Sequence, residues 1–333
     1  TNDEAYNVRA SAINAFGQSP YSAATSATPA PVPRGLFAGG YNGSSQVNVI
    51  DFVDISTDAN ASDFGDLSAN NQGGASCSSS TRGVFAGGST SGASSARDTI
   101  EYVTIATEGN VTDFGDLNEA KMHHAGLSNS TRGVFTDGRR TNNTTNSGNL
   151  RYITIASTGN SVDFGGDYIN RAEQASFASP TRGIIGGGQS SGTYRDHIAY
   201  ITIASTGDAQ SFGDLTAATL TLTGASSTTR GIFAGGYVSG GNTNVIQYIT
   251  IASTGNATDF GDLTAATQDN TGSSNSTKVI FAGGYINGQN SVVDTIDKIT
   301  IASTGNASDF GNLTAARAGM SNGQVSPSHG GIS

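Results

Sequence analysis

The strongest constraint on the fold of this chain is an internal repeat with a period of 48 to 50 residues. Two phrases recur in register, one of the form TRGVFAGG and one of the form ITIASTGNATDFGDLTAAT, which occupies residues 249–267 and returns almost unchanged at 299–317. The basic residue of the first phrase marks six copies, at Arg34, Arg82, Arg132, Arg182, Arg230 and Lys278. A period of this length, rich in Gly, Thr and Ser and without a helical apolar stripe, predicts a repeated β unit.

Each copy has the pattern of four short strands. In the fifth copy an apolar stretch begins at Ile232 and ends at the glycine pair 235–236, and the β-branched run VIQYITIA follows at 245–252. The turn residues Thr-Gly-Asn at 254–256 separate this run from a third strand, ATDFGDL. The small residues NTGSSNS at 270–276 predict a fourth strand, which enters a tight turn before the next copy.

Four antiparallel strands in about 48 residues match one blade of a β-propeller. The small-residue strand fits nearest the central axis, where blades crowd together, and the strand that contains Phe260 fits further out. The run IQYITIA is apolar on both faces, as expected for a strand enclosed between two neighbouring blades. A linear β-solenoid is the alternative, but its rungs are usually shorter than this repeat.

The two ends of the array predict how the ring closes. The array starts at Pro33 and Arg34, directly in the strand RGLFAGG and without the small-residue strand that precedes it in the other copies. It finishes with AGMSNGQ at 318–324, which has the pattern of an extra copy of the missing strand. Pairing of this last strand beside the first would leave no sheet edge open. We therefore predict an all-β fold with a six-bladed β-propeller over residues 34–333.

The glycine pairs that follow an apolar strand resemble the kelch repeat. They lie at residues 39–40, 87–88, 235–236 and 283–284, and the third copy has Asp137 and Gly138 instead. In kelch blades a Tyr and then a Trp follow the pair. Here Tyr102 lies 14 residues beyond Gly88, but the next aromatic residue is Phe114 and the chain contains no Trp. The resemblance is therefore to a kelch-like variant of the propeller.

The longer phrase, RGVFAGG followed by IEYVTIATEGNVTDFGDL, is similar to repeats of kelch-like virion structural and tail-appendage proteins of marine tailed bacteriophages, cyanophages in particular. The similarity covers residues 33–333, and the ending SPSHGGIS looks like the terminus of such proteins. It implies an extracellular or virion protein, in a tail fibre or another surface appendage, with a role in host attachment or in architecture. The implied partners are a host cell-surface glycan or protein and other virion subunits.

Upstream of the repeats, YNVRASAINAFGQSPYSAATSATP at 6–29 resembles the last two strands of a fibronectin type III domain. Tyr6, Val8, Ala10 and Ala12 alternate along one strand, and Gly17 lies in the hairpin. We predict three parts: the fibronectin type III-like strands at 1–29, a stiff linker at 30–33 and the propeller. Such a fragment would not fold alone, so we expect a longer protein, in which upstream regions would mediate any homo-oligomer.

Composition argues against several other classes of protein. The net charge of -10 speaks against a nucleic-acid partner, because such binding depends on clustered Lys and Arg. No apolar run is long enough for a membrane helix, and the first residues show no signal peptide, so we expect no membrane insertion. The single cysteine, Cys77, cannot form an internal disulfide and is expected to be a small buried residue.

The sequence offers little support for catalysis, and we predict that the protein is not an enzyme and needs no cofactor. Acidic residues such as Asp259 and Asp262 recur at equivalent positions, whereas a catalytic carboxylate pair occurs once, so hydrogen bonding at turns and strand ends explains them better. Calcium binding to this motif is the weaker alternative. His123, His124, His197 and His329 lack the spacing of a zinc site, and we expect solvated loop residues.

The strand order assigns the loops to two faces. The turns after the small-residue strand and at STGN fall on one face and are nearly identical in every copy. The loops after the glycine pair and after DFGDL fall on the other face and vary, for example from YNGSSQVN to RRTNNTTNSGN. Because the linker enters from the constant side, this variable face would point away from the rest of the protein. Loops on a rigid scaffold can change without disturbing the core, so we expect binding there.

Tyr and Arg side chains are frequent at binding hot spots. Nine candidate ligand-binding residues lie in or beside the variable loops, at Tyr41, Arg97, Arg139, Arg140, Tyr194, Arg195, His197, Tyr237 and Tyr285. The sequence thus predicts a non-enzymatic module that attaches to a host surface. The alternatives are an architectural virion protein that packs against other tail or capsid subunits and, less favoured, a glycan-cleaving enzyme.

Overall fold

The computed structural model of the chain describes residues 6–9, 11, 13–14, 17–19, 21, 25–27, 32–92, 94–141, 148–286, 289 and 291–332. These residues form strands and connecting loops with no α-helix, as predicted for an all-β protein. Consequently, no helix in this part of the chain has the length and apolarity needed to cross a membrane. The chain divides into two units, Thr1–Val32 and Pro33–Ser333.

In the first unit the strands pair antiparallel, β1 (Tyr6–Val8) with β4 (Thr25–Ala27) and β2 (Ile13–Asn14) with β3 (Gly17–Gln18). Gly17 adopts a φ of 122°, which glycine tolerates best. The nested pairing is that of a hairpin, in agreement with the two strands expected here. Ala10 and Ala12, which were expected to continue the first strand, lie outside the described residues.

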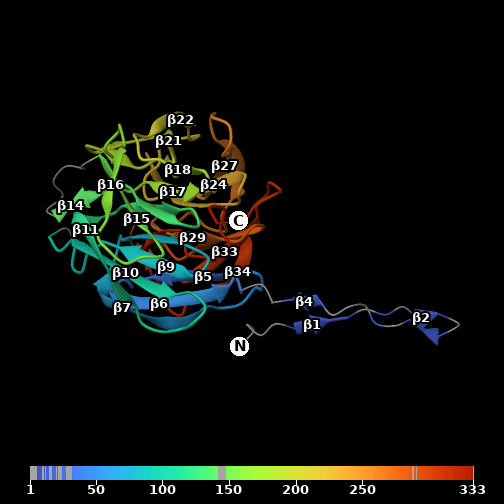
Figure 1. The fold of residues 1–333 in the computed structure, drawn as a ribbon. Coiled ribbons are helices and arrows are strands. Elements are labelled where there is room, and N and C mark those ends of the chain that lie inside the picture. The colour runs from blue at the N-terminus through green and yellow to red at the C-terminus, as the bar shows by residue number, and fades with distance from the viewer. Residues whose placement is uncertain are drawn as a thin grey trace. The chain divides into compact units, whose positions relative to one another are not determined.

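In the second unit, every sequence copy forms its own antiparallel sheet section (Figure 1). The first has three strands, β5 (Arg34–Ala38), β6 (Val47–Asp54) and β7 (Ser62–Asn71). The second has β8 (Ala75–Ser78), β9 (Arg82–Ala86), β10 (Arg97–Thr104) and β11 (Thr112–Met122). The third has β12 (Ala125–Ser128), β13 (Arg132–Phe135), β15 (Asn149–Thr154) and β16 (Val162–Gly166).

The last three copies repeat the four-stranded pattern. They contain β17 (Ala175–Ala178), β18 (Arg182–Gly186), β21 (His197–Thr202) and β22 (Gln210–Asp214); β23 (Thr223–Ser226), β24 (Arg230–Ala234), β27 (Val245–Thr250) and β28 (Thr258–Asp262); and β29 (Thr271–Ser274), β30 (Lys278–Ala282), β33 (Thr295–Thr300) and β34 (Ser308–Asn312). The strands predicted for the fifth copy are therefore found where the sequence placed them.

Short strands lie in the variable loops. They are β14 (Arg139–Arg140), which pairs with β11, and the small hairpins β19 (Gln189–Ser190) with β20 (Thr193–Tyr194), β25 (Tyr237–Val238) with β26 (Gly241–Asn242), and β31 (Tyr285–Ile286) with β32 (Ser291–Val292). These hairpins extend the loops after the glycine pairs.

The C-terminal segment does not form the simple closing strand that the sequence predicts. It is bonded to β5 at two points, where Ser321 N–H donates to the Ala38 carbonyl and Leu36 N–H donates to the Val325 carbonyl, each at 3.0 Å. Between them β35 (Asn322–Gly323) instead pairs in parallel with β8 and β12, which joins the second and third copies into one ten-stranded sheet. Gly323, with a φ of 133°, lies in β35, where the segment departs from the β5 register.

This segment lies among the small-residue strands. β35 contacts β8, β12, β17, β23 and β29, and each of these strands is fully buried and contacts its neighbours. Further along, Gly330 N–H donates to the Ser226 carbonyl at 3.0 Å. The small side chains of these strands therefore leave room for the chain's own C-terminal segment.

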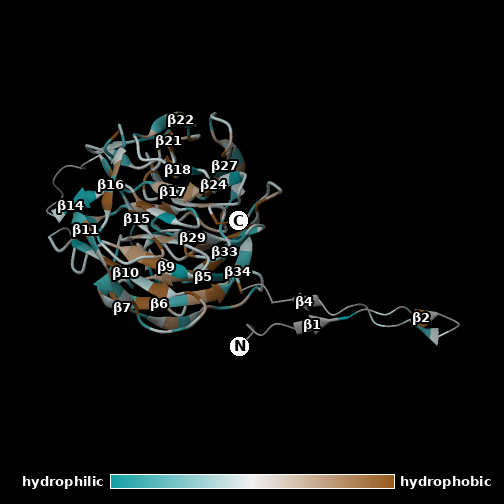
Figure 2. Ribbon diagram, viewed as in Figure 1, coloured by the Kyte–Doolittle hydropathy of each residue, from teal (hydrophilic) through white to brown (hydrophobic). Residues whose placement is uncertain are grey.

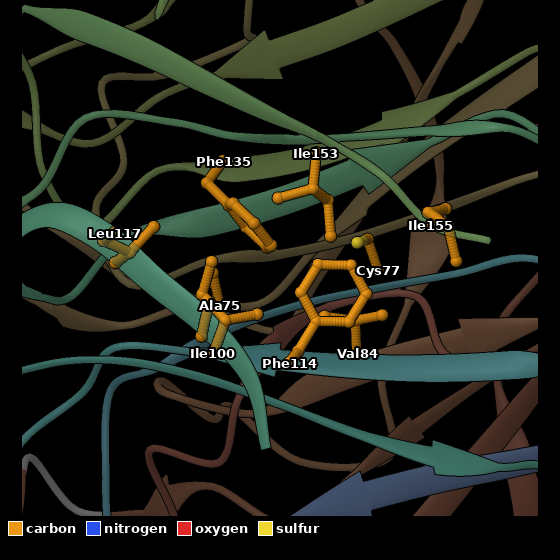
Figure 3. Packing of buried hydrophobic residues seen from close by; sticks show 10 residues of the cluster. Ala75, Cys77, Val84, Ile100, Phe114, Leu117, Phe135, Ile153 and Ile155 are labelled. Carbon is orange, nitrogen blue, oxygen red and sulfur yellow. The ribbon is translucent and has the colours of Figure 1, made fainter. Parts of the chain in front are cut away.

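Apolar side chains pack between consecutive copies. Figure 3 shows one such cluster, in which Phe135, Ile153 and Ile155 of the third copy meet residues of the second, including Cys77. Five equivalent clusters join the other neighbours, and in one of them Phe37 and Ile55 of the first copy pack against Phe310 of the sixth. Figure 2 shows hydrophobic stretches along the strands of this unit. Cys77 is buried as predicted, and burial raises the pKa of its thiol.

The repeated phrase STGN bonds each copy to the one before it. Asn256 Oδ1 accepts the Asp214 N–H at 3.0 Å, and Gly255 N–H donates to the Phe212 carbonyl at 2.8 Å. The equivalent residues of the other copies make the same asparagine or aspartate contact. Between the sixth and first copies, Asn60 Oδ1 accepts the Asn312 N–H at 3.0 Å. These asparagines therefore serve the scaffold.

The arginine of the other phrase also bridges neighbours. Arg182 lies over the Tyr200 ring, 4.6 Å from its centroid, and donates to the Ile251 carbonyl of the next copy at 3.0 Å. Arginines of four other copies repeat this arrangement. In the sixth copy Lys278 replaces the arginine, and it pairs at 3.2 Å with Asp58 of the first copy, to which Lys298 is also bonded. The first and last copies are thus joined by ion pairs.

Six residues with positive φ, one from each copy, are joined by a cyclic set of backbone hydrogen bonds. They are Gly73, His123, Glu173, Thr221, Asp269 and Gly319, with φ between 54° and 64°. Each N–H donates to the carbonyl of its counterpart in the preceding copy, and Gly73 donates to Gly319, at 2.6 to 2.9 Å. A bulky or β-branched residue rarely adopts this φ, so the cyclic bonding accounts for the conformation of Glu173 and Thr221. We call these six residues the axial ring.

Candidate ligand-binding face

The variable loops lie at one end of the strands and the constant turns at the other. Because the strands of each copy pair antiparallel, successive connections alternate between the two ends. The axial ring immediately precedes the small-residue strands, so it lies at the same end as the variable loops. The loops and the ring together can therefore build a site from several copies.

A depression of about 650 Å³ lies at this end. Four members of the axial ring contribute to it, and hairpin residues of the fourth and fifth copies supply Tyr194 and Tyr237. Its lining consists of His123, Arg139, Glu173, Gln189, Gly192, Tyr194, Leu220, Thr221, Tyr237, Gln268, Asp269 and Gln289. Three of the nine predicted residues, Arg139, Tyr194 and Tyr237, are thus brought together. We call this the axial depression.

Both carboxylate oxygens of Glu173, in the axial depression, have partners. Arg139 Nη2 lies 2.6 Å from its Oε1, and Gln189 Nε2 donates to its Oε2 at 2.6 Å. The side chain of Glu173 is 8% exposed and that of Arg139 is 26% exposed. An ion pair this far removed from water is stronger than a surface pair, because the local dielectric is lower. The positive charge of Arg139 is therefore already paired with the carboxylate of Glu173.

Asp269 differs from Glu173 because no described residue donates a hydrogen bond to its carboxylate. Burial, together with the negative charge of Glu173, raises the pKa of Asp269 to about 7, and Arg139 opposes the shift. Burial also lowers the pKa of His123, against the influence of Glu173, so its imidazole is neutral near pH 7. The axial depression thus holds two carboxyl groups and one cation that is already paired.

Tyrosine side chains pack in pairs on this face. The rings of Tyr194 and Tyr237 meet edge to face with centroids 6.2 Å apart, and those of Tyr41 and Tyr285 lie 6.5 Å apart. Burial, Asp269 and Tyr41 raise the pKa of Tyr285 to about 12. Tyr285 also exchanges backbone hydrogen bonds with Gln268, a residue of the axial depression. Tyr41 and Tyr285 therefore lie beside the depression without lining it.

The other four predicted residues have separate partners and do not line the axial depression. Arg97 bonds Ser68 at 3.0 Å and Glu101 at 3.2 Å. Arg140 pairs with Glu119 at 2.7 Å, and His197 Nδ1 lies 3.0 Å from Asp214. The Arg195 backbone bonds Gly188 and Thr219. The nine candidates are therefore not one site.

The prediction of solvated histidines is wrong for His124 and His329, which are each 1% exposed. Nε2 of His124 lies 2.9 Å from the Ala86 carbonyl, and burial lowers its pKa to about 3. His329 lies among the inner strands, within 3.3 Å of the Ser128 hydroxyl, and burial lowers its pKa to about 4. Both imidazoles are neutral and belong to the core. Their burial could not be predicted from the sequence, because one histidine lies in a loop and the other in the C-terminal tail.

A cavity of about 30 Å³ shares His123, Glu173, Thr221 and Asp269 with the axial depression. Asn270 and Asn322 also line it. Asn270 is 5% exposed, and its Oδ1 has no hydrogen-bond donor among the described residues. An unpartnered buried carbonyl oxygen is costly, so this oxygen needs a water or a ligand hydroxyl as donor.

Within the described ranges, no group of three or more His, Cys, Asp and Glu side chains could hold a metal ion. A separate cleft of about 320 Å³ lies where the sixth copy meets the first, but its lysines, Lys278 and Lys298, are both paired with Asp58. The axial depression, by contrast, is a cavity in which loops of several copies meet.

No protein-family model matches this chain, and a search of curated proteins finds no match. The proposal for its function therefore depends on the geometry of the axial depression and on the resemblance of the repeats.

Replacing Asp269 with Asn should make stability less dependent on pH. The folded-state pKa of about 7 lies above the ordinary value of 3.8, so folding disfavours the ionised carboxylate. The native chain should therefore lose stability as pH rises from about 4 to about 7, on the order of 4 kcal/mol at about 1.4 kcal/mol for each pKa unit. Thermal midpoints at pH 4.5 and pH 8 should show that the advantage of Asp269→Asn over the native chain increases with pH. An advantage that is equal at both values would contradict the shift.

Proposed function

We propose that residues 33–333 form a closed six-bladed β-propeller that acts as a non-enzymatic binding module. Support for the closed ring comes from the contacts between the sixth and first copies and from the cyclic hydrogen bonds of the axial ring. Each copy supplies a short antiparallel sheet, which is the composition of a propeller blade. The kelch-like resemblance of the repeats favours the same architecture.

The module attaches, in this proposal, to a glycan on the surface of a host cell. The observation that carries it is the axial depression, where separate variable loops place Arg139, Tyr194 and Tyr237 around carboxyl and amide groups. Aromatic rings beside a few placed polar groups are typical of a small-ligand site. Its location at the end of a tail fibre or other virion appendage follows from the resemblance of the repeats to phage proteins.

Binding of the fluorescently labelled 333-residue chain to intact marine cyanobacterial strains would test this function. We expect binding to at least one strain, and the combined change Arg139→Ala, Tyr194→Ala and Tyr237→Ala should reduce it at least about tenfold, because hot-spot side chains are lost. Tyr168→Ala is the control, since Tyr168 is 51% exposed and lies outside the depression. Undiminished binding by the folded triple variant would contradict the proposal. A virion map with the depression buried against another subunit would favour the architectural role instead.

The two carboxyl groups favour a second candidate, cleavage of a glycan. The depression holds the carboxyl groups of Glu173 and Asp269, and the Asp269 pKa of about 7 suits the general acid of a glycoside hydrolase. Release of reducing sugar from cell-surface polysaccharide, abolished by Asp269→Asn, would establish it. Binding without any release would support the non-enzymatic module.

A further inference from the structure

We propose that the axial depression takes a neutral saccharide residue, whose hydroxyl groups donate hydrogen bonds to Asp269, and that it rejects saccharides that carry a carboxylate. The inference rests on the proposed function and specifies the chemical class of its ligand. Its basis is the distribution of donors, acceptors and charges among the residues of the depression.

Glu173 and Asp269 differ in whether their carboxylate oxygens already accept hydrogen bonds. Both oxygens of Glu173 are occupied, by Arg139 and Gln189 at 2.6 Å each. The carboxylate of Asp269, by contrast, receives no hydrogen bond from any residue that the structure describes. A carboxylate accepts hydrogen bonds only, so the partner that completes Asp269 must be a donor. Sugar hydroxyl groups are such donors, and two on adjacent carbons can reach both oxygens of one carboxylate.

The charged groups of the depression also restrict the class of ligand. The cation of the depression, Arg139, is held by Glu173, and His123 is neutral because burial lowers its pKa. A uronic or sialic acid would therefore bring its carboxylate close to two carboxyl groups without gaining a cation. Removing a charge from water without a partner is costly, and a like charge increases that cost. The depression consequently favours a ligand without negative charge.

Aromatic rings and side-chain amides make up much of the remaining lining of the depression. Tyr194 and Tyr237 present aromatic rings, which suit the apolar C–H face of a pyranose. Gln189, Gln268 and Gln289 add amide groups that can exchange hydrogen bonds with hydroxyls. In the small cavity that shares four residues with the depression, the Asn270 Oδ1 is buried and has no donor among the described residues. This second observation, independent of the acidic residues, also indicates a ligand or water that donates.

A glycan array followed by titration calorimetry tests the inference, with the 333-residue chain at pH 8. The array should carry oligosaccharides that end in glucose, galactose or mannose, and matched ones that end in glucuronic acid or sialic acid. We expect retention of one or more neutral glycans and at least about tenfold weaker binding of their acidic counterparts. In calorimetry with the best neutral glycan, Asp269→Asn should lower the affinity at least about tenfold.

The variant Asp269→Asn suits this test because Asn tolerates the positive φ of 54° at this position, and the backbone bonds of the axial ring need no carboxylate. Asp259→Asn is the matched control, an exposed aspartate of the same copy that lies outside the depression. It should leave the affinity unchanged.

Equal or tighter binding of acidic glycans, or unchanged affinity of Asp269→Asn, would overturn the inference but leave glycan attachment intact. Retention of no glycan, together with no binding to cells, would instead overturn the proposed function. The two failures are therefore distinguishable.

Discussion

Deletion of residues 321–333 should lower the thermal midpoint of the chain by roughly 5 °C, which corresponds to a loss of about 3 kcal/mol for a unit of this size. The segment supplies acceptors for hydroxyls of the inner strands: Ser76 donates to the Gly323 carbonyl at 3.1 Å, and Thr271 donates to the Ser321 carbonyl at 2.9 Å. Water can replace these acceptors, but it cannot replace the packing of Val325, which is fully buried between the first and second copies.

Deletion of residues 332–333 alone is the control, because the described hydrogen bonds to the inner strands are made by residues 321–330. It should leave the midpoint nearly unchanged. Differential scanning calorimetry on the three chains measures the effect. A longer deletion as stable as the native chain would mean that the six copies hold together without their C-terminal segment.

The substitution Gly261→Ala should destabilise the chain by about 2 to 4 kcal/mol, whereas Gly255→Ala should cost less, because only backbone strain opposes it. A Cβ atom on Gly261 would lie 2.4 Å from the Gly305 carbonyl oxygen of the next copy, so the two copies would have to separate. A Cβ atom on Gly255 meets nothing within 4 Å. The first copy already has Ala59 at the position of Gly255.

The pair of variants separates contact from backbone strain, because Gly255 and Gly261 have similar φ angles of 159° and 149°. Urea unfolding of both variants beside the native chain gives the two free energies. Equal losses would attribute the effect to the backbone conformation and would argue against tight contact between the copies.

The strands and turns of the copies could be predicted from the sequence, because the residue patterns that specify them are local and recur in all six copies. The strand Val245–Thr250 is flanked by a glycine pair and a Gly-Asn turn, and both signals act within a few residues. The phrase STGN was expected to be a turn, but its second role was not anticipated. Asn256 also bonds a backbone N–H of the preceding copy, a contact between residues 42 positions apart.

The course of the C-terminal segment could not be predicted in detail. The string AGMSNGQ has the small residues of an inner strand, and composition does not distinguish a regular strand from one displaced at a glycine. Gly323 allows the displacement because a Cβ atom there would lie 1.9 Å from the Ser76 carbonyl oxygen. This crowding exists only once the inner strands have assembled around the segment.

The candidate site was predicted in part. Arg139, Tyr194 and Tyr237 were chosen as exposed hot-spot residues in variable loops, and they do line one depression. Glu173 and Asp269 were missed because they lie 96 residues apart and match no motif. The repeat could have indicated them, because Glu173 and Asp269 occupy the same position of their copies, just before the small-residue strand. The other members of the axial ring occupy that position too. The cyclic hydrogen bonds bring these equivalent positions together.

Residues that recur in every copy are expected to build the scaffold, and residues that differ between copies are expected to bind the ligand. Measuring stability and ligand affinity on the same variants tests this division most directly. Gly261→Ala should lower the thermal midpoint and, at temperatures where it is folded, bind the array-selected glycan as tightly as the native chain. Tyr194→Ala combined with Tyr237→Ala should keep the midpoint within a few degrees and lose binding. Lost affinity in folded Gly261→Ala, or full affinity in the tyrosine variant, would contradict the claim.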